Sequence, residues 1–277
     1  MRSPLSSLML AGVLLGSAGT ASAQTWNGSV SDLWSNASNW TPNTVPNSTT
    51  ASVTITNATN NPVLIDIAPT IANLTLGGTN SASLNNGESL TIAGGGGAGA
   101  LDIAGTLTVG STGSFTDLIL GGTSGSTITL SGGGTLALSD SPNNRVYSTT
   151  GDTLVNSAGN TIQGSGQFGI NNAGFAFTLN NAGIINANQS NALQVAPTNT
   201  VTNTNLMEAT NGGTLNLIAT VTNTGGTIQA TGAGSVVELS GSTITGGTLT
   251  TASGGAVQNS GTATLNGVTI SPGSTVT

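Results

Sequence analysis

Val155-Asn156-Ser157-Ala158-Gly159-Asn160-Thr161-Ile162 is a short pattern that returns, with substitutions, three more times along the chain. The later copies occupy residues 179–185, 202–209 and 222–230. When Gly159, Gly183, Asn205 and Gly225 are taken as equivalent, the pattern has a period of roughly 20 to 24 residues, which shortens from copy to copy. A repeat of this length is typical of a solenoid, in which each unit forms one coil and the coils stack.

Short alternating runs lie between the Asn and Gly residues of the repeat. In residues 215–218 and 235–239, apolar and polar side chains alternate, and this alternation predicts short strands with one buried face. Gly-Gly, Asn-Gly and Ser-Gly pairs supply the positive φ angles that corners require. A four-residue strand cannot satisfy its backbone alone, but a neighbouring coil at about 4.8 Å can pair with it. The sequence therefore predicts an all-β fold, a parallel β-helix (β-solenoid).

The recurring Asn residues at the corners have two interpretations. Their side-chain amides could form a ladder that runs up the stack. Alternatively, they could serve ordinary turn chemistry, because Asn tolerates the left-handed backbone conformation. The sequence leaves both interpretations open.

The first part of the chain is typical of a secretory signal peptide. Arg2 supplies a positive start, residues 8–15 a short apolar run, and Ala21-Ser22-Ala23 a small-residue cleavage site. That run is too short to span a bilayer, and no later segment is long enough. We therefore expect a signal peptide at residues 1–23, an N-terminal cap segment at 24–50, and solenoid repeats at 51–277.

All three tryptophans of the chain, Trp26, Trp34 and Trp40, fall in the cap segment. An open stack exposes a strand edge and the apolar end of its first layer, so it requires a cap. We therefore interpret this segment as an aromatic cap. The alternative is that the three rings lie exposed in one plane as a platform for sugars, which makes them the candidate ligand-contact residues.

The run from Ser139 to Ser148 interrupts the rhythm of short strands and turns. It contains Arg145, the one basic residue after position 23, and Tyr147, the one tyrosine of the chain. We expect a lateral, solvated loop here, with a binding role for Arg145 and Tyr147 as the alternative.

Composition excludes several classes of function. The chain has a formal net charge of −7, two basic residues, no cysteine and no histidine. Without a basic patch, nucleic acid and anionic membrane are not expected partners. Without Cys or His, there is no disulfide framework, thiolate site or imidazole base. We expect no metal, no cofactor and no membrane span after removal of the signal.

The nine acidic residues are scattered at wide intervals. A sugar hydrolase needs two carboxylates that flank one bond. On spacing alone, stacked coils could bring together Asp102 with Asp117, or Glu208 with Glu238. The basic residues that would bind acidic sugars are nearly absent, so we expect no catalytic residue and no enzyme activity.

Thr-x-Thr pairs recur along the chain and suggest another use of a flat strand face. A regular Thr array on a β-helix could order water as ice does. The unequal steps of the repeat would spoil a flat lattice unless the additional residues loop out elsewhere. The alternative is that Thr suits the solvent side of a strand.

Several stretches resemble a known class of exported protein. They are Trp26-Asn27-Gly28 with the later Trp and Pro residues, Asn73-Leu74-Thr75-Leu76-Gly77-Gly78, and residues 160–167, 208–215 and 245–249. These are similar to the passenger regions of bacterial autotransporters and to filamentous-haemagglutinin-like β-strand-repeat surface proteins. The resemblance implies a right-handed parallel β-helix at the surface of a Gram-negative-type bacterium. It carries over no catalytic residue.

The chain departs from the pattern of these proteins in two respects: no translocating barrel follows residue 277, and no haemagglutinin-type secretion motif lies near the start. We therefore expect a C-terminally truncated chain that lacks a barrel or anchor.

The expected function is an exported structural or adhesive stalk, secreted or at the cell surface, without catalysis. Roughly nine to eleven coils would make a rod on the order of 45–55 Å long. Its expected partners are host or environmental glycans or surface proteins. The main alternative is a carbohydrate-binding or carbohydrate-active β-helix, followed by ice binding.

Overall fold

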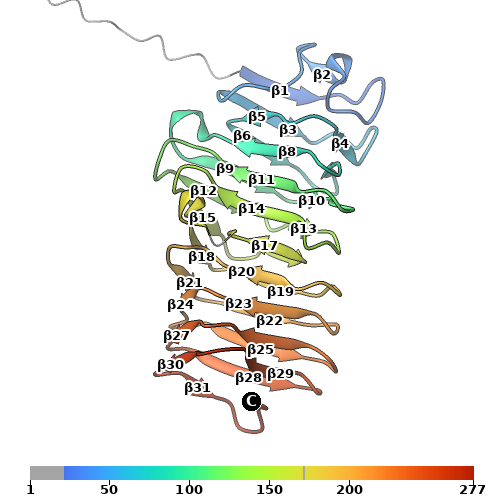
Figure 1. Cartoon of the computed structure of the whole chain (residues 1–277). Helices are drawn as coiled ribbons and strands as arrows, with labels where there is room; N and C mark the ends of the chain where they lie inside the picture. The colour runs from blue at the N-terminus through green and yellow to red at the C-terminus, as the bar shows by residue number, and fades with distance from the viewer. Residues whose placement is uncertain (1–21, 171) are drawn as a thin grey trace, which may run out of the picture.

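The computed structural model describes residues 22–170 and 172–277. In this part of the chain, short strands wind about one axis from the N-terminal end, blue, to the C-terminal end, red (Figure 1). The predicted signal peptide lies outside the described residues, apart from Ser22 and Ala23.

Three sheets, here named A, B and C, form the walls of the stack. Sheet A contains β1 (Ser22–Trp26), β2 (Trp40–Thr41), β3 (Ala51–Ile55), β6 (Asn73–Leu76), β9 (Gly99–Ile103), β12 (Thr127–Ser131), β15 (Thr153–Asn156), β18 (Thr178–Asn181), β21 (Val201–Asn203), β24 (Thr220–Thr222), β27 (Thr243–Thr245) and β30 (Thr264–Asn266). Sheet B contains β4 (Val63–Ile65), β7 (Ser81–Leu84), β10 (Thr106–Val109), β13 (Thr135–Leu138), β16 (Thr161–Gly164), β19 (Ile184–Ala187), β22 (Leu206–Ala209), β25 (Thr227–Thr231), β28 (Thr248–Ala252) and β31 (Thr269–Ile270). Sheet C contains β5 (Thr70–Ile71), β8 (Ser89–Ile92), β11 (Thr116–Leu120), β14 (Asn144–Ser148), β17 (Gly166–Phe168), β20 (Leu193–Val195), β23 (Thr214–Leu217), β26 (Val236–Leu239) and β29 (Ala256–Asn259).

The chain visits the sheets in a fixed order. From β3 onward each turn contributes one strand to sheet A, one to B and one to C, so that strands three apart in sequence are neighbours in a sheet. These neighbours run parallel, whereas β1 and β2 run antiparallel. The stack has about nine turns. The predicted parallel β-solenoid is confirmed.

Three short 3₁₀ helices interrupt the strands of the described chain. They are η1 (Ala37–Asn39), η2 (Gly94–Gly96) and η3 (Ala173–Phe175). No helix in the described ranges is both long and apolar enough to cross a bilayer.

The core is a narrow apolar column between the three sheets. Every second residue of a strand points inward, and parallel register places inward residues of successive turns directly above one another. In sheet B one such row is fully buried and consists of Leu107, Leu136, Ile162, Ile185, Met207, Ile228 and Leu249. Each turn thus receives apolar contacts from the turns on either side, which explains why strands of three to five residues are stable.

An amide ladder fills the corner between sheets A and B in the second half of the stack. Nδ2 of Asn156 donates to Oδ1 of Asn181, Asn181 donates in the same way to Asn203, and Asn203 to Asn223, each at 2.7 Å. All four side chains are buried. The ladder interpretation of the recurring Asn residues is therefore confirmed.

The N-terminal cap gives all three sheets a partner at the blue end of Figure 1. Strand β1 extends sheet A by pairing with β3. Over sheet B, Trp34 N donates to Leu64 O and Leu64 N donates to Asp32 O, both at 2.8 Å. Over sheet C, Thr70 N donates to Oδ1 of Asn47 at 3.0 Å. The raw edges that an open stack would expose are covered at this end.

The prediction of a loop at residues 139–148 is wrong for the second half of that range. Residues 144–148 form β14, which pairs with β11 and β17 inside sheet C. The inward positions of β14 are Asn144, Val146 and Ser148, all fully buried. Because two of these three are polar, the alternation of apolar and polar residues that marks the other strands is hidden here.

Candidate functional site

The three cap tryptophans are buried rather than displayed. Trp26 is 1% exposed, and Trp34 and Trp40 are 0% exposed. Trp40 packs edge to face with both others, at centroid distances of 4.9 and 4.7 Å. The indole N–H of Trp26 donates to Thr59 O, that of Trp34 to Pro46 O, and that of Trp40 to Trp34 O. The condition for a sugar platform, three rings exposed in one plane, is not met, and the arrangement is that of a packed cap.

The carboxylate pairs raised on spacing do not come together. Asp102 lies in β9 of sheet A and Asp117 in β11 of sheet C, while Glu208 lies in β22 of sheet B and Glu238 in β26 of sheet C. Members of each pair therefore sit on different walls of the stack. In the described ranges no three or more acidic residues gather into a group that could hold a metal ion.

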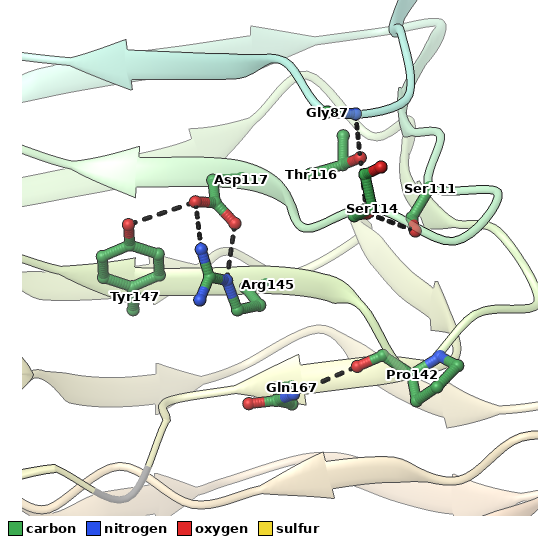
Figure 2. Close-up of polar contacts among 9 residues, drawn as sticks. All are labelled: Gly87, Ser111, Ser114, Thr116, Asp117, Pro142, Arg145, Tyr147 and Gln167. Atoms are coloured by element: carbon green, nitrogen blue, oxygen red, sulfur yellow. Dashed lines mark hydrogen bonds and ion pairs between the residues drawn. The ribbon is translucent and has the colours of Figure 1, made fainter.

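A different constellation gathers on the outer face of sheet C. The register of β11 and β14 places Asp117 beside Arg145 and Ile119 beside Tyr147. Arg145 donates from Nε to Oδ1 of Asp117 at 2.7 Å and from Nη2 to Oδ2 at 2.6 Å. The Tyr147 hydroxyl donates to the same Oδ2 at 3.2 Å. Figure 2 shows the three side chains converging from two adjacent strands.

Two phenylalanines complete this constellation. The Arg145 guanidinium carbon lies 3.9 Å from the centroid of the Phe115 ring, within the range of a cation–π contact. Tyr147 meets Phe175 of η3 edge to face at 5.3 Å. Phe115 is 53% exposed, whereas Tyr147 is 8% exposed. We call Phe115, Asp117, Arg145, Tyr147 and Phe175 the sheet C cluster.

The electrostatics of the cluster favour a neutral ion pair. The hydrogen bonds to Asp117 raise the pKa of the Arg145 guanidinium. Burial, together with the negative charge of Asp117, raises the pKa of the Tyr147 hydroxyl. Near neutral pH the arginine is therefore cationic and the tyrosine uncharged, so that the cluster carries no net charge when Asp117 is ionised.

The turn before Phe115 is held by its own polar contacts, which Figure 2 shows beside the cluster. The Ser111 hydroxyl donates to Ser114 O at 2.7 Å, and Gly87 N in the turn above donates to Oγ1 of Thr116 at 3.0 Å. Ser111 N also donates to Oδ1 of the buried Asn144 at 2.9 Å. Phe115 therefore projects from a braced corner rather than from a free loop.

A line of polar side chains extends from the cluster down the same face. Successive register partners place one outward residue per turn in this line, which we call the C-face row: Ser89, Asp117, Arg145, Gln167, Gln194, Asn216, Glu238 and Gln258. Its members rise by about 4.8 Å per turn, the spacing of strands in a sheet. Gln167 donates from Nε2 to Pro142 O at 3.1 Å, a contact visible in Figure 2.

The sequence points to Arg145 together with Tyr147, and to Asp117 in a different pairing with Asp102, but it does not bring the three residues together. Asp117 and Arg145 are 28 residues apart, a separation that no copy of the repeat shows. Neither segment alternates cleanly between apolar and polar residues, and the contact becomes visible only when β11 and β14 are placed in register. The binding alternative for Arg145 and Tyr147 stays a prediction.

Sheet A presents a second regular surface. Thr220, Thr243 and Thr264 are register partners, and so are Thr222 and Thr245. The intervening Val221 and Ile244 are fully buried, so the threonines face outward. Asn180, Thr202 and Thr222 remain in register although the two turns that separate them differ in length, so the additional residues are accommodated outside the strands.

One protein family has a model that matches this chain. It is described as a domain of unknown function (DUF8693), and the match covers residues 25–119. The matched range includes the N-terminal cap, the first turns of the stack and the Phe115–Asp117 part of the sheet C cluster. No curated protein and no solved structure matches the chain.

Proposed function

We propose that this protein is an exported β-solenoid that serves as a structural stalk or adhesive surface of a bacterial cell, without catalysis. The observation that carries the proposal is the continuity of the stack. Backbone ladders and the apolar column run through about nine turns below a closed cap. Such a body is stiff and elongated, and its long sides are available for contact.

The sides of the rod support an adhesive role. They present mostly threonine, asparagine, serine and glutamine, which both donate and accept hydrogen bonds. With 4% charged residues, these faces would contact neutral surfaces without the cost of desolvating many charges.

Export is supported by the sequence of residues 1–23 and by the resemblance to passenger and haemagglutinin-like repeats. It is tested by expressing the full chain with a C-terminal tag in a Gram-negative host. We expect cleavage after Ala23 and a product that is accessible to protease on intact cells or present in the medium. Leu10→Arg in the apolar run should retain it in the cytoplasm, whereas Ser6→Thr should not. Retention of the unaltered chain in the cytoplasm would contradict export.

The stalk itself is tested on the mature protein by small-angle scattering and circular dichroism. We expect an elongated particle and a β-rich spectrum. Adhesion is then measured as retention of beads coated with this protein on glycan-coated or cell-coated surfaces. A compact particle, or beads that adhere no better than uncoated ones, would contradict the proposal.

Ice binding is a second candidate, favoured by the register of the Thr-x-Thr pairs on sheet A. It predicts thermal hysteresis that is reduced by Thr222→Tyr, which would break the flatness of that face. The matched control is Thr248→Tyr on sheet B, which should have no effect. Absence of hysteresis in the intact protein at millimolar concentration would remove this candidate.

A further inference from the structure

We infer that the outer face of sheet C binds a neutral, extended oligosaccharide chain that lies along the axis of the solenoid. One sugar stacks on the free face of Phe115, and the following sugars exchange hydrogen bonds with the C-face row. This inference rests on the proposed adhesive function and names the class of ligand that one of its faces takes.

Phe115 offers an aromatic surface that is both open and fixed. Arg145 covers one face of the ring at 3.9 Å, while 53% of the residue remains exposed. The apolar C–H face of a sugar packs well on such a ring, because the ring is apolar and carries negative charge density on its face. Since Arg145 and the braced corner already hold the ring, binding orders little that was free before.

Phe115 is also distinguished by its position. The other large apolar side chains exposed in the described part of the chain lie in the cap or in the last turn: Val30, Leu33, Leu265, Ile270 and Val276. Among these residues Phe115 alone lies on a long side of the rod, where a ligand could extend over several turns.

The charges of the cluster indicate a neutral ligand. Asp117 and Arg145 form a bidentate pair, so neither has a free charge to offer to an ionic group. The chain as a whole carries a net charge of −7, which repels uronic or sulfated sugars. Nη1 of Arg145 makes no hydrogen bond within the described chain and remains a donor for a hydroxyl oxygen.

The C-face row supplies one polar side chain for each turn along the direction of the ligand. Gln167 is held by its bond to Pro142 O and retains its side-chain oxygen as an acceptor. Two turns further on, the side-chain oxygen of Asn216 is buried and has no hydrogen-bond partner in the described chain. Buried acceptors are seldom left unsatisfied, and a ligand hydroxyl that reached this oxygen would satisfy it.

The spacing of the row suits a sugar chain. Each turn rises by about 4.8 Å, so Asp117 and Asn216, four turns apart, are separated by about 19 Å along the axis. A turn is close to the length of one sugar unit in an extended chain, and the footprint from Phe115 to Asn216 therefore corresponds to about five units. Hydroxyl groups and amide side chains each donate and accept, so such a chain can pair at every turn.

The inference is tested by calorimetric titration of the mature protein with three probes: cellohexaose, maltohexaose and hexagalacturonate. We expect at least one of the two neutral hexasaccharides to bind, and to bind more tightly than hexagalacturonate. Phe115→Ala should weaken that binding at least tenfold, and Phe115→Trp should preserve it. Val30→Ala, which removes an exposed apolar side chain from the cap, is the matched control and should leave affinity unchanged.

A second pair of variants tests the row. Gln194→Ala lies within the footprint and should weaken binding severalfold, whereas Gln258→Ala lies beyond it and should not. Circular dichroism of each variant should match the unaltered protein, since all of these side chains face outward.

Three outcomes would overturn the inference: no binding of either neutral probe at millimolar concentration, equal affinity of Phe115→Ala and the unaltered chain, or tighter binding of hexagalacturonate. If these occur while export and an elongated, adhesive particle are observed, the stalk proposal stands and the sheet C site falls.

Discussion

Asn203 occupies the middle of the amide ladder, where its Nδ2 donates to Asn223 and its Oδ1 accepts from Asn181, both at 2.7 Å. Replacing it with alanine leaves one buried N–H of Asn181 without an acceptor, while the same nitrogen keeps its bond to Leu206 O, and leaves the buried Oδ1 of Asn223 without its donor. Each unsatisfied group costs about 1–3 kcal/mol, so we expect Asn203→Ala to lower the free energy of unfolding by at least about 2 kcal/mol. Denaturant titration followed by circular dichroism measures this.

The control for this prediction is Asn180→Ala, which changes an outward residue of β18 one strand position from the ladder. Its expected effect is within about 0.5 kcal/mol, as is usual for surface positions. Equal effects of the two substitutions would mean that the ladder contributes nothing specific.

Tyr147 is the one tyrosine of the chain, so absorbance near 295 nm reports its ionisation alone. Burial and the charge of Asp117 raise its pKa above the ordinary tyrosine value of 10.0. We expect a titration midpoint above 10 in the folded protein and near 10 in denaturant. Because the folded state holds this proton more tightly, the cluster's contribution to stability is present below pH 10 and is lost as pH rises through the folded pKa.

Asp117→Asn separates the causes of that shift. The negative charge of Asp117 raises the tyrosine pKa, and the positive charge of Arg145 lowers it. The substitution removes the first effect and leaves the second. The midpoint should therefore move down toward 10. A midpoint at or below 10 in the unaltered folded protein would contradict the arrangement of the cluster.

Single elements of this fold are short, and their corners decide whether turns can stack. Gly164 ends β16 with a φ of +120°, and a Cβ atom there would collide with the backbone oxygen of Leu138 in the turn above. Gly133 has a φ of +79°, but no atom lies within 4 Å of a Cβ placed on it. The first glycine is required by both conformation and space, the second by conformation alone.

We therefore expect Gly164→Ala to destabilise the protein much more than Gly133→Ala. The latter should cost about 1–2 kcal/mol, the penalty of a left-handed conformation for an L-residue. The former adds a backbone collision that only a shift of the two turns relieves. Thermal unfolding of the two variants compares them, and similar midpoints would show that the turns are not packed this closely.

Strands and turns could be predicted from the sequence to the extent that alternation was visible. The runs around Leu215 and Val237 were recognised because apolar residues occupy every inward position. Strand β14 was missed because Asn144 and Ser148 face inward as members of a polar corner. Local pattern does not distinguish a polar inward residue from a loop residue.

The sheet C cluster could not be predicted for a different reason. Its members lie in two segments 28 residues apart, and the length of a turn varies along the chain. The number of residues in each corner decides which residues of successive turns become neighbours. This number depends on the tertiary structure and cannot be derived from the local sequence. The cap tryptophans show the converse: because an open stack must be closed somewhere, the sequence predicts that they pack in a cap, and all three are buried.

At the scale of the molecule, each turn contacts mainly the turns above and below it. The stability of the stack is therefore approximately the sum of the stabilities of its turns and of the contacts between neighbouring turns. Trp34 is fully buried in the cap and donates its indole N–H to Pro46 O at 3.1 Å. Trp34→Ala should cost about 3–5 kcal/mol, as for other large-to-small core changes. This loss should be local to the cap and the first turns.

Hydrogen exchange measures that locality. In Trp34→Ala we expect faster exchange in β3 to β8 and unchanged exchange in β22 to β29. Val30→Ala, an exposed position of the same cap, should change neither region. Uniformly faster exchange along the whole chain would indicate a single cooperative unit instead.

The direction of the backbone ladders also has a mechanical consequence. Hydrogen bonds between successive turns point along the rod, so tension applied to its two ends pulls directly on them, a few at a time. The force needed to extend the rod is then set by the hydrogen bonds of one turn rather than by those of all turns together. The turn from Asn203 to Asn223 would release about 70 Å of slack when it peels away. Under tension the molecule would lengthen in steps as single turns unfold. A tether of this kind absorbs the energy of a sudden pull while most of its turns stay folded.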